Sequence, residues 1–313
     1  YTIIDWSSFC MDNYSPLRYP GGKHALYPIV LNAIKLNKGN NKKIKQVYVE
    51  PFAGGAGVAC KLLINNEIDL VIINDADKAV YSFWRTVMES PKWFIQKIQE
   101  TPVNIDEWKK QRRVFLEGKY FSKELGFAMF YLNRTNRSGI INAGPIGGYS
   151  QEGTYKIDCR FNKAMLISKI ETLAKYRHKV KVYNQDVFRF LERYLPRETD
   201  TQKVFIYFDP PYFEKGQRLY LNHFSKLDHM NLRNAVVELN CKWIMTYDDR
   251  PEINDLYSNF IRSHFAINYS LSNKSKGREL MICKDKSCIP TVDALSKLTH
   301  AVVFDEVAGG VVL

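Results

Sequence analysis

The segment Val204–Phe208 has the sequence VFIYF and runs directly into Asp209, Pro210, Pro211 and Tyr212. This apolar run is β-branched and aromatic, and it is too short for a buried helix. It therefore predicts a central strand of a sheet that is covered on both faces. The two prolines cannot donate to a strand ladder, and they fix the backbone just past the strand. Because open α/β sheets place ligands at the carboxyl ends of strands, this rigid elbow is a candidate site. A strand stop with no further role is the alternative.

Two regions of the chain alternate strands with helices, and this alternation predicts a parallel, doubly wound sheet. The first region holds expected strands at Gln46–Glu50 and Leu70–Asn74, with helices from about Ala56 to Ile64 and from Asp77. The second region holds expected strands at Lys179–Tyr183, Val204–Phe208 and Lys242–Tyr247, with helices from about Val187 and over about Lys226 to Leu239, and shorter strand candidates at Ile261–Ser270 and Arg278–Cys283.

Between these regions, from about residue 86 to residue 161, the pattern changes to aromatic residues at helical spacing. Helices are expected at Pro91–Glu100, Ile105–Glu117 and Ser122–Arg134. The Gly-rich segment Asn136–Gly153 follows, and a loop of that length is usually functional or disordered. We interpret residues 86–161 as a domain inserted into a sheet domain made of residues 11–85 and 162–286. Residues 287–313 form a tail of unknown role.

Composition limits the class of protein. With 313 residues and 45% hydrophobic content, the chain is expected to be globular, with one or two domains. No apolar run is long enough to span a bilayer and no leader is evident, so a cytoplasmic protein is expected. The first residue is not methionine, and Met11 is expected to lie near a native start. Six scattered cysteines without a Cys-x-x-Cys pair indicate reduced thiols rather than a metal site.

Net charge gives the first indication of a partner. The chain carries a formal charge of +12, with a pI near 9.2. A basic protein of this size is often drawn to nucleic acid or to an anionic membrane surface. A solvated basic surface is the alternative on charge alone.

The segment Val49–Ala59, VEPFAGGAGVA, follows an expected strand and opens an expected helix. Its glycines, Gly54 among them, allow a tight turn and close approach to a ligand at the free N–H groups of the helix N-terminus. Asp75 ends the next strand about twenty residues on, where a carboxylate can bind a ribose diol. Together these features indicate an adenosine-bearing cofactor, without separating a nicotinamide cofactor from S-adenosylmethionine.

A third segment, Leu17–Lys23 or LRYPGGK, lies just before an expected helix. Gly21 and Gly22 allow close approach of a ligand, and Lys23 would complement a cofactor carboxylate. The alternative is a Pro-Gly turn with a solvated lysine.

These segments, in this order, resemble the Dam-like DNA adenine-N6 methyltransferases, the alpha group of amino-methyltransferases. The similarity runs from about Leu17 to Cys283 and is carried by RYPGGK, EPFAGGAG, NDAD, YLNRTNRSG, DPPY and GRELMI. It implies a Rossmann-like methyltransferase sheet that uses S-adenosylmethionine, with the insert, mostly helical, as a target-recognition domain. It also implies double-stranded DNA as the partner.

The resemblance assigns roles by motif. Asp75 would hold the cofactor ribose, Asp186 of NQDVF would lie near the cofactor adenine, and Asp209 would touch both cofactor and target. The remaining residues expected at the cofactor are Tyr19, Gly22, Lys23, Phe52 and Gly54. The insert departs most from the family pattern at NAGPIGGYSQEG, so base contacts are not carried over. Arg134 and Arg137 are the residues we expect to contact DNA, because arginine binds both phosphates and guanine edges.

The chemistry of DPPY fits methylation of an exocyclic amine, whose lone pair is delocalised into the base. Asp209 and the Pro210 carbonyl can accept both amino hydrogens, and Tyr212 can stack on a base removed from the duplex.

Phe224 is expected either to form a second wall for that base or to pack in the core. His229 is expected to be a helix residue satisfied by its neighbours, rather than an acid or base. A cytosine-C5 enzyme would need a thiol, typically after a proline, and no cysteine here follows one.

We therefore predict a site-specific methyltransferase that acts on adenine N6 in double-stranded DNA, encoded by a prokaryote or phage. A cognate restriction endonuclease is a candidate partner. The rivals are methylation of cytosine N4 or of adenine in RNA, and a catalytically silent DNA-binding module. A nicotinamide-dependent oxidoreductase would not explain DPPY. The recognition sequence and the oligomeric state do not follow from the sequence.

Overall fold

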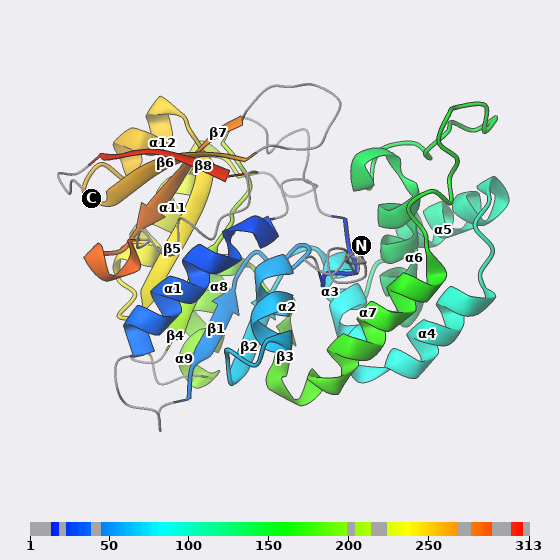
Figure 1. Ribbon diagram of the computed structural model, residues 1–313, viewed down its shortest axis with the longest axis horizontal. Helices are drawn as coiled ribbons and strands as arrows, with labels where there is room; N and C mark the ends of the chain where they lie inside the picture. The colour runs from blue at the N-terminus through cyan, green and yellow to red at the C-terminus, as the bar shows by residue number, and fades with distance from the viewer. Residues whose placement is uncertain are drawn as a thin grey trace, which may run out of the picture.

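The computed structural model describes residues 14–18, 23–38, 45–198, 204–213, 224–267, 277–289 and 302–308. Within them one mixed sheet has eight strands in the order β3-β2-β1-β4-β5-β7-β6-β8 (Figure 1). The strands are β1 (Val47–Glu50), β2 (Leu70–Asn74), β3 (Val180–Tyr183), β4 (Val204–Phe208), β5 (Lys242–Asp248), β6 (Ile261–Ile267), β7 (Gly277–Cys283) and β8 (Val302–Ala308).

The first five strands are parallel, as the alternation of strands and helices predicts. β1 lies between β2 and β4, and Val49 pairs with Ile72 on one side and Ile206 on the other. The carboxyl ends of β1, β2 and β4 therefore meet at one edge of the sheet. The strand order reverses at β1, and open sheets place their ligands at such a point.

The other end of the sheet is antiparallel, which corrects the expectation of a parallel sheet throughout. β7 lies between β5 and β6 and runs antiparallel to both, and β8 pairs antiparallel with β6. The connection from Ile267 to Gly277 spans nine residues, 268 to 276. That is shorter than the crossover that parallel neighbours need, so an antiparallel pair results.

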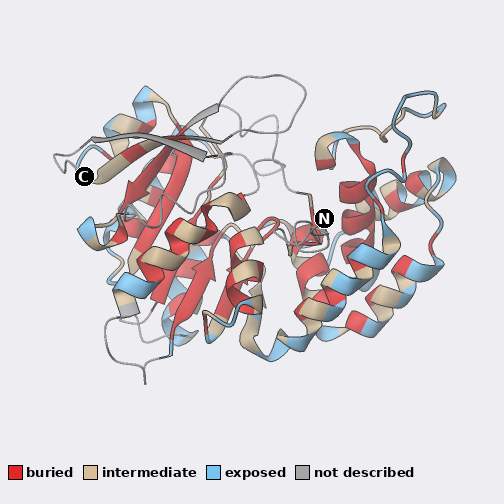
Figure 2. Ribbon diagram, viewed as in Figure 1, coloured by how far each residue is buried: buried red, intermediate tan, exposed pale blue. Residues whose placement is uncertain are grey.

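Helices cover both faces of the sheet, so the sheet is doubly wound as expected. On one face α1 (Tyr27–Lys38), α2 (Gly57–Ile64), α3 (Lys78–Glu89) and α7 (Lys163–Lys175) pack on alternate strand residues such as Tyr48 and Phe205. On the other face α8 (Val187–Arg189), α9 (Leu195–Glu198), α11 (Lys226–Val237) and α12 (Pro251–Leu256) pack on the intervening residues such as Val49 and Ile206. The central strands β1, β2, β4 and β5 are accordingly buried, as Figure 2 shows.

The three helices expected between the sheet regions are present as α4 (Pro91–Glu100), α5 (Ile105–Glu117) and α6 (Lys123–Thr135). They gather beside α3 and α7, away from the strands (Figure 1). Gly126 of α6 packs directly on α3, because an added Cβ would lie 2.5 Å from the Ser82 carbonyl oxygen. Phe83 of α3 stacks on Phe130 of α6, with ring centroids 5.9 Å apart. The insert and one face of the sheet therefore share a continuous core.

The Gly-rich segment Asn136–Gly153 adopts a defined loop. Gln151 holds it together: its Nε2 donates to the Ile146 carbonyl at 2.7 Å, and its Oε1 accepts from the Ile157 N–H at 2.9 Å. Gly147 and Gly148 have φ of 83° and 76°, values that favour glycine.

Apart from short 3₁₀ and π-helical turns, three of the described elements were not expected from the sequence. They are α7, α12 and the strand β8, which lies in the segment expected to be a tail. In the described residues no helix has the length and apolar character that a membrane span requires.

Candidate active site

Asp209 lies where the buried strand β4 ends at the centre of the sheet. Every residue of Val204–Phe208 is buried, whereas the Asp209 side chain is 26% exposed. Pro210 is buried directly after it. Since prolines cannot extend the ladder, the strand stops here and presents the carboxylate at the sheet edge.

A chain of hydroxyl groups orients the Asp209 carboxylate. Thr246 of β5 donates its hydroxyl to Oδ1 at 2.9 Å, and the Tyr207 hydroxyl lies 2.9 Å from that of Thr246. Burial raises the pKa of Asp209 to about 6. The Lys23 ammonium, 3.9 Å away, opposes this shift, and the Glu279 carboxylate adds to it. Among the described residues Oδ2 has no hydrogen-bond partner, so it is a vacant acceptor at the sheet edge.

Lys23 and Tyr212 meet beside Asp209. Lys23 lies in the 3₁₀ helix η2 (Lys23–Leu26) before α1, and its ammonium donates to the Tyr212 hydroxyl. The same ammonium lies 4.9 Å from the centre of the Tyr212 ring. Glu279 of β7 accepts from Lys23 Nζ at 2.6 Å and from the Tyr212 hydroxyl at 2.8 Å. Glu279 was not among the expected site residues, although GRELMI places an acid inside an apolar strand.

The glycine loop after β1 turns sharply into α2. Gly54 has a φ of 44°, and Ala56 adopts the left-handed region with the same φ, which is uncommon for a residue with a Cβ. The Gly54 N–H donates to Asp75 Oδ2 at 2.8 Å, and Trp84 Nε1 donates to the Gly54 carbonyl at 2.9 Å. The loop is thus held at both its N–H and its carbonyl against β2 and α3.

Asp75 and Asn74 tie the ends of three strands together. Asp75 Oδ1 accepts from the Asp77 N–H at 2.9 Å, and burial followed by the nearby Asp77 carboxylate raises the pKa of Asp75 to about 7. Asn74 was not expected at the site. Its Nδ2 donates to the Pro51 carbonyl at 3.1 Å and to the Gln185 carbonyl at 3.0 Å. The loops that follow β1, β2 and β3 therefore form one unit.

The other expected cofactor residues in the described part of the chain make no hydrogen bond to Asp209 or Asp75. Asp186 is exposed and caps α8, accepting from the Phe188 N–H at 2.9 Å. Phe52 is partly buried after β1, at the same sheet edge as Gly54. Tyr19 and Gly22 lie outside the described residues.

The family model of D12 class N6 adenine-specific DNA methyltransferases matches residues 19–271, which are most of the chain and include Lys23, Gly54, Asp75 and Asp209. The chain belongs to this family. The resemblance found in the sequence is confirmed, and the protein is an adenine-specific DNA methyltransferase with a Rossmann-like sheet.

Relatives agree with this assignment. The Type II methyltransferase M.MjaIII of Methanocaldococcus jannaschii is 27% identical over 226 residues, which are 68% of this chain and 73% of that protein. Two solved structures of the rRNA methyltransferase aviRa from Streptomyces viridochromogenes, at 1.5 Å and 2.4 Å, are each 14% identical. They cover 94% of this chain and 96% of their own, with a TM-score of 0.41. A similarity that low adds nothing to the family assignment.

An aromatic cluster borders the methyltransferase site on its other side. Phe224 packs edge-on against Phe52, with centroids 5.7 Å apart, and stacks on Phe188 at 6.4 Å. Phe224 is partly buried there, so it contributes to packing as one of its two expected roles requires. His229 of α11 is 1% exposed, and its Nδ1 lies 2.8 Å from the Tyr247 hydroxyl. Burial lowers the pKa of His229, which agrees with a neutral core histidine. Its Nε2 is buried without a hydrogen-bond partner among the described residues, so the expectation that its neighbours satisfy it holds only for Nδ1.

The two arginines expected at DNA differ in exposure. Arg134 of α6 is only 7% exposed, and its Nε donates to the Arg160 carbonyl at 2.8 Å. Arg137 is exposed in the short helix η3 (Arg137–Gly139). Arg134 lies in α6, which belongs to the group of helices beside the sheet (Figure 1), and Arg137 follows two residues after that helix.

Arg134 is one of three arginines that lie close together. Burial lowers its pKa to about 10, with Arg18 and Arg160 lowering it further. Arg18 Nη1 is buried without a hydrogen-bond partner among the described residues, and none of the three forms an ion pair there. Asn133 fixes Arg18 in place: its Oδ1 accepts from the Arg18 N–H at 2.7 Å, and its Nδ2 donates to the Arg18 carbonyl at 2.8 Å. The cluster joins the insert to the segment that leads to Lys23.

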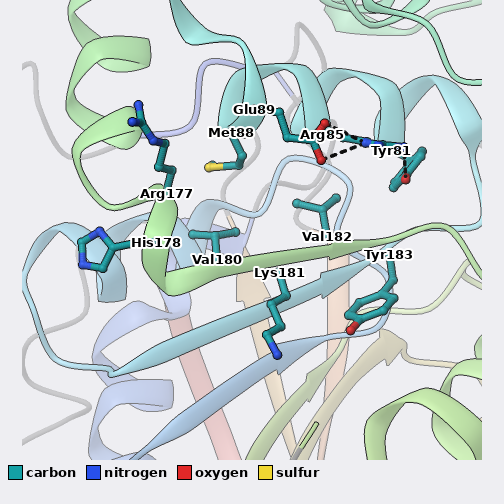
Figure 3. Close-up of a pocket in the computed structure, with 10 residues that line it drawn as sticks. All are labelled: Tyr81, Arg85, Met88, Glu89, Arg177, His178, Val180, Lys181, Val182 and Tyr183. Carbon is teal, nitrogen blue, oxygen red and sulfur yellow. Dashed lines mark hydrogen bonds and ion pairs between the residues drawn. The ribbon is translucent and has the colours of Figure 1, made fainter. Parts of the chain in front are cut away.

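A groove of about 580 Å³ lies elsewhere, between α3 and the edge strand β3 (Figure 3). Val180, Val182 and Met88 line it, and Arg177 stands at its rim. It contains none of the expected site residues. In the described part of the chain, no group of three His, Cys, Asp or Glu side chains could hold a metal ion.

Glu50, buried beneath the site, should make stability depend on pH. Its Oε1 accepts from the Tyr48 hydroxyl at 2.8 Å and from the Ala59 N–H at 3.0 Å. Burial raises its pKa from 4.5 to about 8, against those two hydrogen bonds. Between these values the folded state holds a proton that the unfolded state has released. The free energy of unfolding should therefore fall as the pH rises from about 4.5 to 8.

Urea unfolding at pH 5 and pH 8 measures this effect. A Glu50→Gln variant keeps an acceptor oxygen but cannot ionise, so its free energy of unfolding should fall less over the same interval. The other acids are present in both proteins, so the difference between the two proteins reports Glu50 together with its interaction with Asp209. An identical pH dependence in the two proteins would contradict the assignment to Glu50.

Proposed function

We propose that this methyltransferase transfers a methyl group from S-adenosylmethionine to N6 of an adenine rotated out of double-stranded DNA. The observation that carries the proposal is the arrangement at the sheet edge. The vacant acceptor of Asp209 at the end of β4 lies at the same edge as the glycine loop of β1 and Asp75 of β2. The family assignment supports adenine in DNA as the target. The arrangement of Asp209, the glycine loop and Asp75 supports methyl transfer to an amine.

The residues at β1 and β2 fit an adenosine-bearing cofactor. Gly54 turns its backbone without a Cβ, and Asp75 faces it with a carboxylate whose pKa is raised to about 7. Each carboxylate oxygen has a second lone pair, so Asp75 can bind a ribose diol while it holds the loop. When bound, S-adenosylmethionine supplies a methyl group that its sulfonium makes electrophilic. Lys23, Phe52 and Asp186 are further residues expected at the cofactor. Tyr19 and Gly22 are expected there too, but lie outside the described residues.

At the target, Asp209 would act as a hydrogen-bond acceptor. Its Oδ2 and the Pro210 carbonyl can accept the two amino hydrogens of adenine, which draws electron density back onto the nitrogen. The nitrogen would then bond to the methyl carbon as the carbon–sulfur bond breaks with its electron pair on sulfur, and the released N6 proton would pass through the Asp209 hydrogen bond to solvent. Tyr212 would stack on the base and hold it in line, so the rate derives from positioning and electrostatics.

The insert, residues 86–161, would be the target-recognition domain, with residues 11–85 and 162–286 as the catalytic domain. Support comes from α4, α5 and α6, which gather outside the sheet, and from the clustered Arg18, Arg134 and Arg160. Three neighbouring guanidinium groups without a carboxylate partner among the described residues repel one another. A DNA phosphate would remove that repulsion. A cytoplasmic location and a cognate restriction endonuclease stay predictions.

Mass spectrometry of nucleosides tests the function. Double-stranded DNA and, separately, RNA are incubated with the protein and labelled S-adenosylmethionine. Labelled N6-methyladenine from the DNA is expected. Labelled N4-methylcytosine, or label in RNA alone, would replace the proposal with one of its rivals. An absence of label in every sample, from protein that binds the cofactor, would overturn it.

Asp75 offers a test of cofactor binding. Asp75→Asn keeps one acceptor oxygen for the loop but loses the charge. The variant should bind S-adenosylmethionine more weakly by about 1–3 kcal/mol, the usual worth of a charged hydrogen bond. Calorimetry measures the affinity, and Asp69→Asn, before β2 at the other edge of the sheet, is the matched control. Equal affinity in Asp75→Asn and the wild type would remove Asp75 from the cofactor site.

The exposed Arg137 offers a test of the DNA contact. If its guanidinium binds only phosphate, Arg137→Ala should weaken binding to all duplexes alike and reduce the salt dependence. If it binds a base edge, the substitution should relax preference at one position by about 1–3 kcal/mol. Titrations at several salt concentrations separate the two. Arg177→Ala, which removes the same charge at the groove beside β3, should leave binding almost unchanged.

Arg134 requires a separate comparison because it is buried. Arg134→Lys keeps the charge but loses the fork of donors, so it should weaken DNA binding while the fold survives. Circular dichroism and the same titrations check both points. Unchanged DNA affinity in a folded Arg134→Lys variant would assign Arg134 to packing alone.

A further inference from the structure

Glu279 is a buried carboxylate at the catalytic edge with no role in the function proposed above. It is 2% exposed and lies on β7, opposite Asp248 of β5 and Phe265 of β6 in the sheet register. The antiparallel direction of β7 brings this early residue of the strand to the carboxyl end of β5, where Thr246 and Asp209 meet. A carboxylate this deeply buried needs close partners, or its desolvation would be too costly.

The partners of Glu279 are themselves two expected site residues. Oε2 accepts from Lys23 Nζ at 2.6 Å and from the Tyr212 hydroxyl at 2.8 Å, and Lys23 also donates to that hydroxyl. The three groups come from η2, from the loop after β4 and from β7. They therefore form a closed triangle that links three separate parts of the chain.

Lys23 has a second carboxylate within reach. Its Nζ lies 3.9 Å from Asp209 Oδ1, compared with 2.6 Å from Glu279. Of the two acids, Glu279 is the one that the ammonium contacts directly. Asp209 is left with one hydrogen bond from Thr246 and a vacant Oδ2 among the described residues.

From this geometry we infer that Glu279 is a positioning residue: it holds the Lys23 ammonium and the Tyr212 hydroxyl, and so keeps the Asp209 carboxylate free to accept the target amine. The inference rests on the proposed function of Asp209. It adds a residue that acts through Lys23 and Tyr212.

Removal of the Glu279 charge should redirect Lys23. Among the described residues Asp209 would then be the nearest carboxylate to the ammonium, and a direct ion pair at Oδ1 would weaken the carboxylate as an acceptor and draw Oδ2 away from the amine. Lys23 already lowers the pKa of Asp209, whereas Glu279 raises it. Loss of the Glu279 charge therefore lowers the pKa of Asp209 in two ways: it removes a neighbouring negative charge, and it brings the Lys23 ammonium closer. The other ionisable groups that interact with Asp209, namely Glu50, Tyr48 and Tyr207, stay unchanged.

The test is the pH dependence of single-turnover methylation, with DNA and cofactor saturating. Glu279→Gln keeps the size and one acceptor oxygen but not the charge. Its rate on the pH plateau should fall roughly ten- to hundredfold, as expected for a misplaced reacting group. The acid limb, set in the wild type by the pKa of Asp209 near 6, should move to lower pH. Glu279→Asp keeps the charge and should restore the position of the limb.

Glu89→Gln is the matched control, because it breaks the exposed pair of Glu89 with Arg85 on α3. It should change neither the plateau nor the limb. An acid limb that stays in place or rises in Glu279→Gln would overturn the inference, since a merely structural role predicts a lower rate without that shift.

A second measurement does not need activity. Carbon-13 NMR titration of the aspartate carboxyls, with the Asp209 signal identified by its absence in Asp209→Asn, gives the pKa of Asp209 directly. This pKa should be lower in Glu279→Gln and close to the wild-type value in Glu279→Asp. If the wild type methylates no nucleic acid, the proposed function fails, and the titration still decides whether Glu279 keeps Lys23 from Asp209. An unchanged pKa in Glu279→Gln would refute the inference.

Discussion

Asp209→Asn should lower the rate of methylation at least about a hundredfold, a typical loss for a contact made in the transition state. The amide keeps the size of the carboxyl and one acceptor oxygen, and Thr246 can still donate to it. It loses the charge that draws the amino hydrogens of adenine, and its NH2 group would face them. Single-turnover methylation with saturating cofactor measures the chemical step apart from cofactor binding.

Asp255→Asn serves as the control for this substitution, because Asp255 is exposed on α12 and its side chain makes no hydrogen bond in the described residues. It should methylate at the wild-type rate. Circular dichroism should show both variants folded. An Asp209→Asn variant that retains more than about a tenth of the wild-type rate would mean that the carboxylate charge is not central to catalysis.

Tyr212→Ala should remove the stacking surface for the target base. Stacking on an aromatic side chain contributes about 1–3 kcal/mol per base. We therefore expect the single-turnover rate to fall by a factor between about 5 and 150. Tyr212→Phe should retain most of the activity, because the ring remains and the pair between Lys23 and Glu279 does not need the hydroxyl.

The Tyr212→Phe variant distinguishes stacking by the Tyr212 ring from a chemical role of its hydroxyl. The hydroxyl donates to Glu279 and accepts from Lys23, so its loss removes two hydrogen bonds without removing the ring. A Tyr212→Phe variant as inactive as Tyr212→Ala would show that the hydroxyl takes part in the chemistry. The stacking role would then be wrong. A Tyr212→Trp variant with near wild-type activity would support stacking independently.

The parallel half of the sheet could be predicted from the sequence almost residue by residue. β2 and β4 begin and end where their apolar runs do, and β1 differs by one residue at its start. These strands are buried on both faces, so their sequences are continuously apolar, and glycine, proline or acidic residues mark their ends. The same property made DPPY and the glycine loop recognisable as neighbours at one sheet edge.

The direction of the later strands could not be predicted in this way. Whether β7 runs parallel or antiparallel to β5 depends on the connection and on the neighbouring strands, and not on the residues of β7 itself. Glu279 was missed for that reason. Its position beside Lys23, 256 residues earlier in the chain, follows only once β7 is placed antiparallel to β5.

The burial of Arg134 could not be predicted from the sequence for a different reason. Helix α6 is buried from Leu125 to Thr135 on all its faces, so its sequence has no polar face that would mark the exposed positions. Arg137, two residues past the end of that helix, is exposed. Motif position alone does not distinguish the two arginines.

The outer strand β3 also bears on how the protein behaves at high concentration. As the last strand of the parallel half, it is an edge strand of the described sheet. Such an edge is a template on which a second copy could add a strand and begin to aggregate. Lys181 is exposed in the middle of β3, and Arg177 and His178 precede the strand at the groove (Figure 3). Two copies that met edge to edge would bring the Lys181 and Arg177 side chains together, and the repulsion between these charges opposes the first step of sheet aggregation.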